Sequence, residues 1–263
     1  MKYALVGDVK SAPRPKTRGI CTHCGGEMIS KCGKVMIWHW AHKTTDMCDP
    51  WWENESDWHR SWKDHFPEEQ QEVSRIDLAT GERHIADVKN MFGLVIEFQH
   101  STMSEAERLS REDFYQDMIW VVDGTRGSSD SAYFRLGTAG PIRKNPLLYQ
   151  IEWLGRSRLL HFWGASSKRV YLDFGNDGPW INVIWRLVSF DPNDGKGIVA
   201  PVIKKCFIED CISGTEVHST FITENHDDEQ FSLPRPLVEI DLNNASRKMP
   251  IKNIALGTIS ISS

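Results

Sequence analysis

The sequence lacks any long hydrophobic run. No apolar stretch of eighteen residues occurs in the 263-residue chain, and the apolar run within residues 1–8 is too short for the core of a secretory signal. A helix that spans a membrane needs about 20 predominantly apolar residues, and the apolar part of a signal peptide needs roughly 7–15. The sequence therefore predicts a cytoplasmic protein without a membrane partner.

The sequence also has no internal repeat and no low-complexity tract, and its cysteines do not indicate a disulfide framework. Six cysteines are present, and two of them, Cys21 and Cys24, form a Cys-x-x-Cys pair near several histidines. This arrangement is typical of metal binding in a reducing compartment rather than of disulfide bonds.

A large excess of positive charge is absent as well. The formal net charge is −5, which argues against a protein that coats nucleic acid through bulk charge. Residues 1–48 nevertheless hold eight Lys or Arg and three acidic residues, a net of +5, which leaves −10 for the rest of the chain. This basic head predicts contacts with the phosphates of a nucleic acid. The candidate residues are Arg14, Lys16 and Arg18, and a solvated loop, which Pro13 and Pro15 favour, is the alternative.

The basic head contains a set of potential metal ligands, which consists of Cys21, Cys24, His39 and His42. A Cys-x-x-Cys turn directs two thiolates to one tetrahedral centre, the glycines after it let backbone amides point at the sulfur atoms, and two imidazoles complete a structural Zn²⁺ site. The His-x-x-His spacing is shorter than in fingers with a long DNA-reading helix. Alternative ligands are Cys32, Cys48 and His23, and a group of Cys and His residues without metal is the simpler alternative.

Two carboxylates lie inside apolar runs in the middle of the chain. Residues 85–88 and 94–99 are rich in β-formers, and the short connection between them ends in glycine, which predicts an antiparallel hairpin. In this hairpin Asp87 would lie close to Glu97, and Gln99 would share a face with Glu97 because side chains alternate along a strand. Two neighbouring carboxylates repel each other unless they share a proton or bind a divalent cation. The hairpin therefore predicts a magnesium-type site.

A helix is expected before this hairpin, with Asp49 as its N-cap and Pro50 at its first position. Its apolar seam consists of Trp58, Trp62 and Phe66. An adjacent polar stripe at positions i, i+4 and i+8 consists of Glu55, His59 and Lys63. These polar residues would form either an exposed ladder of ion pairs or one wall of a reaction site beside the carboxylate hairpin.

The remaining elements predict a mixed sheet. Strands are expected over residues 72–77, 119–124, 168–175 and 180–187. A capping box at Ser104 begins a helix that extends to about Met118. Residues 126–146 are rich in Gly, Ser and Pro and predict a loop, with a short element around residues 133–136 as an option. The order of helix, three meandering strands, helix and strand predicts an α/β (α+β) unit.

Five short motifs occur in one order within roughly the first 125 residues. They are Cys21-x-x-Cys24 with His39-Trp40-Ala41-His42, Glu55-Ser56-x-x-His59-x-x-x-Lys63, Ala86-Asp87-Val88, Ile96-Glu97-Phe98-Gln99-x-Ser101 and Arg111-x-x-x-Tyr115. In this order the motifs resemble the competence protein CoiA-like family, whose members join a zinc-binding segment to a nuclease domain of the PD-(D/E)XK type. The resemblance implies a basic zinc-binding module over 1–48, a restriction-endonuclease-like mixed sheet flanked by helices over 49–215, and a peripheral β or irregular extension over 216–263.

The resemblance also implies a catalytic metal. Asp87 and Glu97 would bind Mg²⁺ or Mn²⁺, and Glu55 would add a further ligand. Such an ion polarises the scissile phosphate and lowers the pKa of an attacking water molecule.

One departure from the family concerns the position of its usual lysine, where this chain has Gln99. An amide can orient a water molecule or a phosphate but carries no charge. Lys63 or Lys89 would then supply the positive charge. His59 is a candidate proton shuttle, because the unperturbed pKa of histidine lies near neutrality.

Three functions are consistent with these features. The first is a metal-dependent deoxyribonuclease that hydrolyses phosphodiester bonds. The second, favoured by Gln99 and by the negative net charge, is a catalytically weak or inactive nuclease-fold adaptor that binds nucleic acid or protein. The third is a structural zinc protein with solvated hairpin carboxylates. The expected partner is nucleic acid, above all DNA, with a homo-oligomer or a partner protein as further options, in competence, recombination or phage defence.

Overall fold

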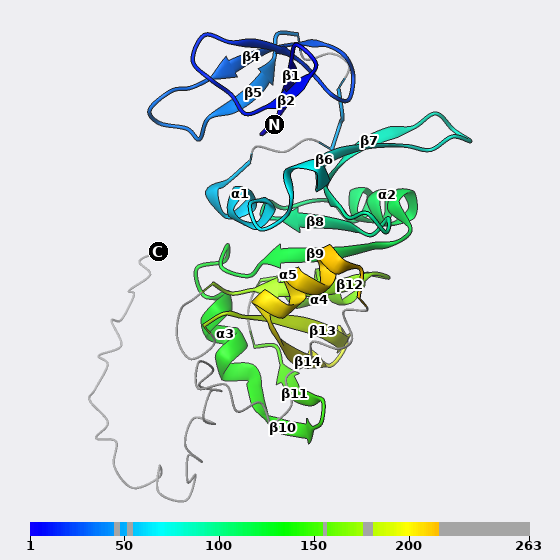
Figure 1. Cartoon of the computed structure of the whole chain (residues 1–263). Helices are drawn as coiled ribbons and strands as arrows, with labels where there is room; N and C mark the ends of the chain where they lie inside the picture. Colours follow the sequence, from blue (N-terminus) through cyan, green and yellow to red (C-terminus); the bar gives the residue numbers. More distant parts are fainter. Residues whose placement is uncertain (45–47, 52–54, 155–156, 176–180, 216–263) are drawn as a thin grey trace, which may run out of the picture.

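The computed structural model describes residues 1–44, 48–51, 55–154, 157–175 and 181–215. These residues form a small N-terminal β-sheet and a large central β-sheet with helices on both faces (Figure 1). The mixed α+β class that the sequence predicted is confirmed. The extension expected over residues 216–263 lies outside the described residues.

The small sheet is antiparallel, with the strand order β2-β1-β3-β4-β5. Its strands are β1 (Ala4–Val6), β2 (Val9–Ser11), β3 (Arg18–Ile20), β4 (Glu27–Lys31) and β5 (His39–His42). Trp40 is buried at its centre and donates an indole hydrogen bond to the carbonyl of Ser11 at 2.9 Å. A side chain at Gly19 would meet the carbonyl oxygen of Leu5 at 2.9 Å, so only glycine lets these strands approach so closely.

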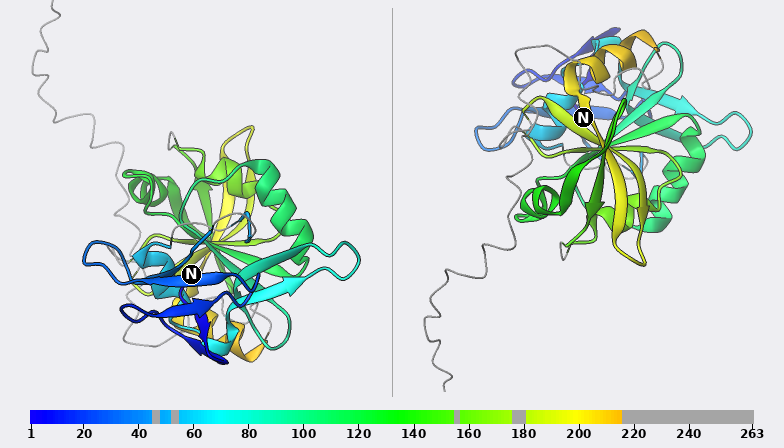
Figure 2. Two further views of the ribbon diagram at one scale, coloured as in Figure 1. Left: turned by 90° about the horizontal axis from the view of Figure 1, so that it is seen from above. Right: turned by 90° about the horizontal axis from the view of Figure 1, so that it is seen from below.

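The large sheet has nine strands in the order β10-β11-β14-β13-β12-β9-β8-β7-β6. They are β6 (Gln71–Ile76), β7 (Arg83–Lys89), β8 (Val95–Gln99), β9 (Met118–Asp123), β10 (Thr138–Lys144), β11 (Leu147–Glu152), β12 (Arg169–Asp173), β13 (Val183–Asp191) and β14 (Lys196–Ile203). β9 is parallel to both of its neighbours, β8 and β12, and the other pairs are antiparallel. Figure 2 shows the strong twist of this sheet, with its strands fanned about the line of sight.

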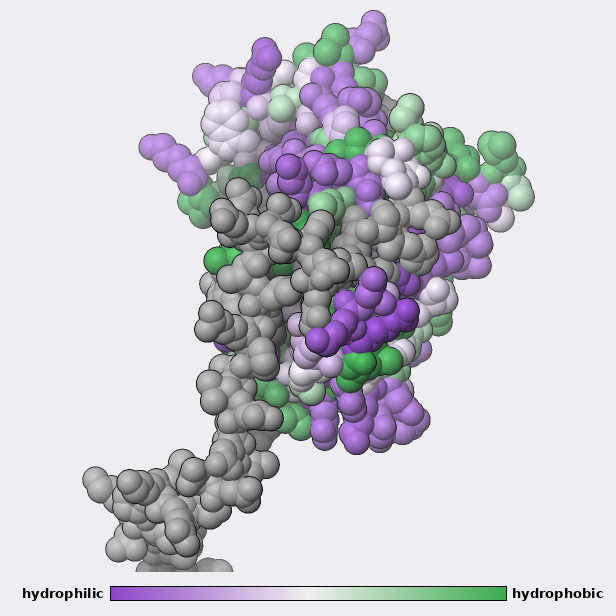
Figure 3. All heavy atoms as spheres, turned by 60° about the horizontal axis from the view of Figure 1, so that its bottom comes forward, coloured by the Kyte–Doolittle hydropathy of each residue, from purple (hydrophilic) through white to green (hydrophobic). Residues whose placement is uncertain are grey.

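Helices cover the large sheet on both faces. They are α1 (Asp57–Lys63), α2 (Glu105–Tyr115), α3 (Asp130–Gly137), α4 (Leu159–Gly164) and α5 (Lys204–Ser213), together with a 3-10 turn, η1 (Glu68–Gln70). Tyr115, Phe134 and Trp163 place α2, α3 and α4 on one face of the sheet. Trp62 and Phe207 place α1 and α5 on the other face. On the side shown in Figure 3, apolar residues lie in small separate groups among hydrophilic ones.

The hairpin predicted around the two carboxylates is formed by β7 and β8. The side chain of Asn90 closes its turn, because its carbonyl oxygen accepts from the backbone N–H groups of Phe92 and Leu94 at 3.0 and 2.9 Å. Gly93 follows with φ +99°, a conformation that other residues rarely adopt. The predicted capping box is also present, since the hydroxyl of Ser104 accepts from the N–H of Glu107 at 3.1 Å.

The predicted start of the first helix is wrong. α1 begins at Asp57, and its N-cap is Ser56, whose hydroxyl accepts from the N–H of His59 at 3.1 Å. Asp49 does not cap this helix, because its carboxylate accepts from the N–H of Ile85 on β7 at 2.6 Å and from that of Trp51 at 2.9 Å. The carboxylate therefore holds the chain against the sheet, a long-range contact that helix-capping rules cannot reveal.

The loop predicted over residues 126–146 is also wrong in part, because β10 forms there and α3 is longer than the short element expected around residues 133–136. Phe134 is fully buried and packs against Phe174, with ring centroids 4.3 Å apart. A Cβ atom at Gly137 would meet the carbonyl oxygen of Glu152 at 2.0 Å, so this glycine permits close contact between the end of α3 and β11. Tertiary packing here overrides the local preference of Gly, Ser and Pro for loops.

The small sheet docks on the β6–β7 edge of the large sheet, as Figure 1 shows near the top of the molecule. The ammonium group of Lys10 donates to the carbonyls of Glu68 and Gln71 at 2.8 and 2.5 Å, and the ring of His23 lies 2.8 Å from the hydroxyl of Ser74. None of the helices described is long and apolar enough to cross a membrane.

We expect Trp62→Ala to destabilise the fold by about 3–5 kcal/mol, because Trp62 is fully buried and its loss leaves a large cavity. The substitution also removes the indole N–H that donates to Asp173 at 2.8 Å. Urea unfolding followed by circular dichroism measures the effect. Trp38→Ala is the control, because Trp38 is 45% exposed and its loss should change stability by less than about 0.5 kcal/mol. Equal effects of the two substitutions would contradict the packing described.

Candidate functional site

A cluster of three thiols and one imidazole lies in the N-terminal part of the chain. Cys21, Cys24, His42 and Cys48 place one ligand atom each within 4.8 Å of one another. The sulfur atoms of Cys21 and Cys48 are 3.9 Å apart, and Nε2 of His42 lies 3.3 Å from the sulfur of Cys24. Tetrahedral Zn²⁺ with Zn–S bonds of about 2.3 Å places two sulfurs about 3.8 Å apart. The donor set and its spacing therefore fit a structural zinc ion.

The backbone around the Cys-x-x-Cys turn supports thiolates. The N–H of His23 donates to the sulfur of Cys21, and that of Gly26 to the sulfur of Cys24, both at 3.4 Å. The pKa of Cys21 is lowered to about 4, chiefly by the hydrogen bond from the Cys48 thiol and against the effect of burial. The same bond raises the pKa of Cys48. One thiolate is thus already favoured in the cluster, as metal binding requires.

The structure corrects the fourth predicted zinc ligand from His39 to Cys48. Because side chains alternate along β5, His39 and His42 point to opposite faces of the strand. The ring of His39 instead lies 2.9 Å from the carbonyl of Ile37. Of the alternatives that the sequence left open, Cys48 joins the cluster and Cys32 does not.

A second group of polar residues surrounds the β7–β8 hairpin. The N–H of Asp87 donates to Oε1 of Glu97 at 3.1 Å, and Oδ2 of Asp87 accepts from the N–H of Phe98 at 3.0 Å. Glu97 is buried, and the side chain of Asp87 is 17% exposed. The structure therefore places the two predicted carboxylates side by side in a largely dry environment.

The two carboxylates have opposite pKa shifts. Burial and then the negative charge of Asp87 raise the pKa of Glu97 well above its usual range, although Arg111 opposes this effect. Burial also acts to raise the pKa of Asp87, but the charges of His59 and Lys63 outweigh it and lower the pKa. The pair therefore favours one ionised and one protonated carboxyl group in the absence of a further cation.

The predicted polar stripe reaches this pair from α1 and from the segment before it. Nε2 of His59 lies 2.8 Å from Oδ1 of Asp87. The ammonium group of Lys63 lies between two carboxylates, 2.6 Å from Glu55 and 2.9 Å from Glu72. Burial would lower the pKa of Lys63, but the charges of Glu72, Glu55 and Asp87 raise it. The stripe is therefore a set of buried ion pairs and not an exposed ladder.

Glu72 is a site residue that sequence reasoning missed. The pairs Gln71–Val88 and Val73–Ala86 place it opposite Asp87 across the β6–β7 ladder. Its carboxylate accepts from the N–H groups of Lys2 and Tyr3 at 2.7 and 3.0 Å. Burial acts to raise the pKa of Glu72, but Lys63 and the N-terminal ammonium group lower it strongly. No spacing signal marks this residue, because its partners come from distant parts of the chain.

The backbone at Glu72 is strained, since its φ of +49° lies in the left-handed region that non-glycine residues seldom adopt. Such strain costs on the order of 1–3 kcal/mol and persists only where surrounding contacts impose it. Here the salt bridge to Lys63 and the two backbone donors fix the side chain. Strain of this kind concentrates at functional sites.

Arg111 of α2 is the other missed residue. One of its nitrogens lies 3.2 Å from Oε2 of Glu97, and the other donates to Glu107 at 2.5 Å and to the carbonyl of Trp51 at 2.9 Å. The only signal in the sequence is its place in the Arg111-x-x-x-Tyr115 motif, to which no chemical role was assigned. Its guanidinium group thus places a positive charge beside the carboxylate of Glu97.

These residues enclose a small cavity of about 60 Å³. It is lined by all six predicted catalytic residues, Glu55, His59, Lys63, Asp87, Glu97 and Gln99, and by Glu72 and Arg111. Lys89 does not line it, so Lys63 is the lysine near the carboxylates. The amide nitrogen of Gln99 donates to the carbonyl of Ser101 at 3.0 Å.

The basic residues of the head lie elsewhere. Arg14, Lys16 and Arg18 are exposed. The first two lie between β2 and β3, and Arg18 is the first residue of β3 and pairs with Glu27 at 3.0 Å. None of the three lines the cavity. Among the described residues, the cluster of Cys21, Cys24, His42 and Cys48 is the only group of three or more His, Cys, Asp or Glu side chains close enough to hold a metal.

We expect Cys48→Ser to lower the zinc content or the zinc affinity of the purified protein at least about 10-fold, because a thiolate ligand is lost. His39→Ala should leave zinc binding unchanged, because His39 lies outside the cluster. Elemental analysis and competition with a chromogenic chelator measure both quantities. Zinc binding that is lost in His39→Ala and unchanged in Cys48→Ser would show that His39 is the fourth ligand.

We expect Lys63→Met to destabilise the protein by about 3–5 kcal/mol at neutral pH, because the buried carboxylate of Glu72 loses its salt bridge and that of Glu55 keeps only Arg60. In the wild type the pKa of Glu72 is lowered from its unfolded value of 4.5, so its contribution to stability is complete above pH 4.5 and is lost as the pH falls below it. In Lys63→Met the carboxylate of Glu72 should have a raised pKa because its salt bridge is lost, so stability should fall as the pH rises. Urea unfolding at several pH values tests this reversal, and Lys205→Met is the exposed control.

The comparisons with known proteins concern the N-terminal part of the chain. Residues 11–50 match the family described as Competence protein CoiA, N-terminal domain. This segment contains Cys21, Cys24, His42 and Cys48, all four residues of the cluster. Searches of curated proteins and of solved structures each gave no match. The predicted relationship is thus confirmed for this segment, which is similar to the N-terminal domain of the competence protein CoiA family.

Proposed function

We propose that the protein is a divalent-metal-dependent nuclease that hydrolyses phosphodiester bonds in DNA. The observation that carries the proposal is the convergence of Asp87, Glu97 and Lys63 on one cavity, beside the imidazole of His59. The match to a competence protein family supports a role in processing DNA during competence. Recombination and phage defence use the same chemistry.

The carboxylates fit a magnesium-type ion. Mg²⁺ and Mn²⁺ prefer carboxylate oxygens. A cation would offset the charge of Asp87, which adds to burial in raising the pKa of Glu97. Asp87 and Glu97 would hold the ion, and Glu55 lines the same cavity. When bound, the ion would polarise the scissile phosphate and lower the pKa of a water molecule.

Lys63 supports the proposal because it can supply the positive charge that Gln99 lacks. A neutral amide cannot balance the charge of a phosphate, whereas the ammonium group of Lys63 is charged at neutral pH, with a pKa raised by its carboxylate neighbours. It comes from α1 and not from β8, so the cation would be supplied by a different element. Gln99 lies at the edge of the cavity and can orient a water molecule or a phosphate oxygen.

His59 is the residue best placed to move a proton. Its Nε2 atom lies 2.8 Å from Oδ1 of Asp87, which would fix the orientation of the ring beside a bound ion. From this position it can accept a proton from water or donate one to the leaving oxygen. The edge of its ring packs against Phe98, with centroids 6.1 Å apart, which limits other orientations.

An adaptor without catalytic activity is the second candidate. The cavity of about 60 Å³ is small, and the carboxylate oxygens facing it already have partners in His59 and Arg111. A metal ion would have to displace these contacts. If breaking these contacts costs more free energy than metal binding releases, no ion would bind and the protein would not cut nucleic acid. It would then bind nucleic acid through Arg14, Lys16 and Arg18 on the basic head.

The decisive experiment incubates the purified protein with labelled single-stranded DNA, double-stranded DNA and RNA in the presence of Mg²⁺ or Mn²⁺. We expect cleavage of DNA that falls by at least about 100-fold in Asp87→Asn and Glu97→Gln, because loss of a metal ligand removes several kcal/mol of transition-state stabilisation. Asp113→Asn, an exposed acidic position on α2, is the control and should retain full activity.

Two results would decide against the nuclease. Cleavage that persists unchanged in folded Asp87→Asn and Glu97→Gln would show that the activity lies elsewhere. Absence of cleavage with every substrate and metal, together with salt-sensitive binding that weakens when Arg14, Lys16 and Arg18 are neutralised, would identify the adaptor.

A further inference from the structure

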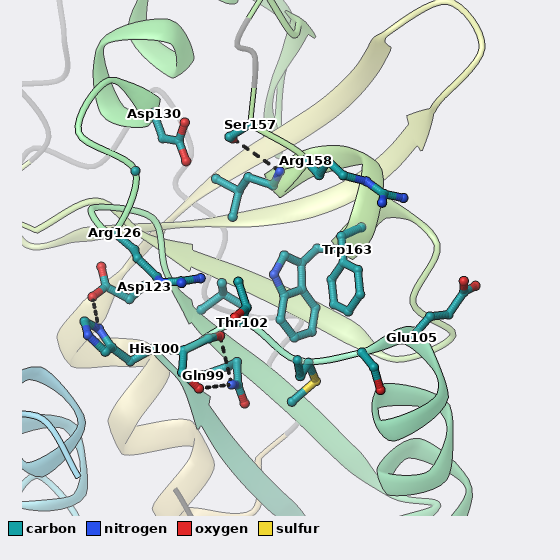
Figure 4. Close-up of a pocket in the computed structure, with 17 residues that line it drawn as sticks. Gln99, His100, Thr102, Glu105, Asp123, Arg126, Asp130, Ser157, Arg158 and Trp163 are labelled. Carbon is teal, nitrogen blue, oxygen red and sulfur yellow. Dashed lines mark hydrogen bonds and ion pairs between the residues drawn. The ribbon is translucent and has the colours of Figure 1, made fainter. Parts of the chain in front are cut away.

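A second and much larger hollow of about 610 Å³ lies beside the site. It opens where the parallel strands β8 and β9 end, and it is bounded by the first turn of α2 and by α4 (Figure 4). Its volume falls in the range of about 300–1,000 Å³ that is typical of small-molecule sites. Gln99 lines both this groove and the smaller cavity, so the two spaces are adjacent.

The most unusual group in the groove is the carboxylate of Asp130. The residue is only 7% exposed, and within the described part of the chain its side chain has no hydrogen-bond or ion-pair partner. Figure 4 shows the carboxyl group directed into the groove. A Cβ atom at Gly127 would lie 2.3 Å from Oδ2 of Asp130, so this glycine makes room for the carboxylate. Its oxygens face the open groove, where they can accept hydrogen bonds from a ligand that supplies donors.

The rest of the groove has the character of a nucleotide site. Arg126 is exposed, extends into the groove in Figure 4, and has no side-chain partner among the described residues. Phe162 and Trp163 supply apolar surface from α4. Asp123 does not repel an anion strongly, because His100 lies 2.6 Å from its carboxylate and Thr125 donates to it. A cation, an apolar wall and a buried acceptor thus surround one space.

We propose that this groove holds one unpaired guanine nucleotide of the strand that enters the neighbouring cavity, an inference that rests on the proposed nuclease function. The carboxylate of Asp130 would accept from N1–H and N2–H of guanine, and Arg126 would pair with a phosphate. Guanine offers two adjacent donors on its Watson–Crick edge, whereas adenine, cytosine and thymine offer a single donor group there. That edge is free only in an unpaired base, so the strand must be single-stranded at this nucleotide.

Fluorescence anisotropy tests this assignment with labelled oligothymidines that carry one central guanine, one hypoxanthine or no substitution. Added Mg²⁺ and Mn²⁺ are omitted, so that binding is measured without cleavage. We expect the guanine strand to bind at least about fivefold more tightly than the unsubstituted strand, because a bidentate contact discriminates bases by this amount or more. Hypoxanthine, which lacks the N2 amino group, should fall between them.

Asp130→Asn should abolish the preference for guanine while retaining binding, and it should fold, because it removes an unpaired buried charge without changing the size of the side chain. Arg126→Ala should weaken the binding of all strands equally and reduce the salt dependence by about one phosphate contact. Asp113→Asn and Arg143→Ala, on exposed surfaces outside the groove, are the matched controls.

A wild type without base preference, or a preference that survives in Asp130→Asn, would overturn the proposal. Competition by guanosine monophosphate as strong as that by the guanine strand would also overturn it, in favour of a free nucleotide as the ligand. Cleavage of DNA without any base preference would refute this inference alone. A guanine preference in a protein that never cleaves DNA would refute the nuclease and leave the base-binding groove.

Discussion

The buried ion pairs of Lys63 form the contact on which the rest of the structure depends. A buried ammonium group is costly unless opposite charges surround it, and here Glu55 and Glu72 lie on two sides of it. Glu72 in turn accepts from the backbone of Lys2 and Tyr3 at the start of the chain. One charge cluster thus joins α1, β6 and the small N-terminal sheet, and it fixes the strained backbone of Glu72 opposite Asp87.

A second connection runs from the Cys and His cluster to the carboxylate hairpin. Cys48 belongs to the cluster, and the next residue, Asp49, accepts from the N–H of Ile85 on β7. Asp87 follows two residues later on the same strand. The carboxylate of Asp49 also lies 2.7 Å from the ring of His84. A metal ion in the cluster would therefore stabilise the segment that positions Asp87, although it would take no part in the chemistry.

The cavity of about 60 Å³ and the groove of about 610 Å³ lie near the same edge of the large sheet. The parallel strands β8 and β9 end at the same edge of the sheet, which is where open α/β sheets commonly bind ligands. The smaller cavity concentrates charge in a nearly dry space, where electrostatic interactions are strong. The larger groove is open and combines Arg126, Asp130 and the aromatic surface of α4. Gln99 lines both of them, so a residue without charge lies between the two spaces.

Much of the local structure could be predicted from the sequence, because it rests on short-range rules. Strand alternation predicted the hairpin with Glu97 and Gln99 on one face, the capping box predicted the start of α2 at Ser104, and the Cys-x-x-Cys pair predicted a metal cluster. The order of five motifs over roughly the first 125 residues predicted a resemblance that the match of residues 11–50 confirms for that segment. Within the predicted loop over residues 126–146 only a short element around residues 133–136 was expected, because the full length of α3 depends on the burial of Phe134 against distant Phe174.

The sequence by itself thus determined the mixed fold, the cysteine pair and the two hairpin carboxylates, since each depends on neighbours within a few positions. Only the tertiary structure decided that Cys48 replaces His39, because the choice depends on which face of β5 meets a distant segment. It alone placed Glu72 and Arg111 at the smaller cavity and Asp130 at the groove. Buried charged side chains pair with residues from distant parts of the chain, and the spacing of residues along the sequence does not indicate which of them are close in space.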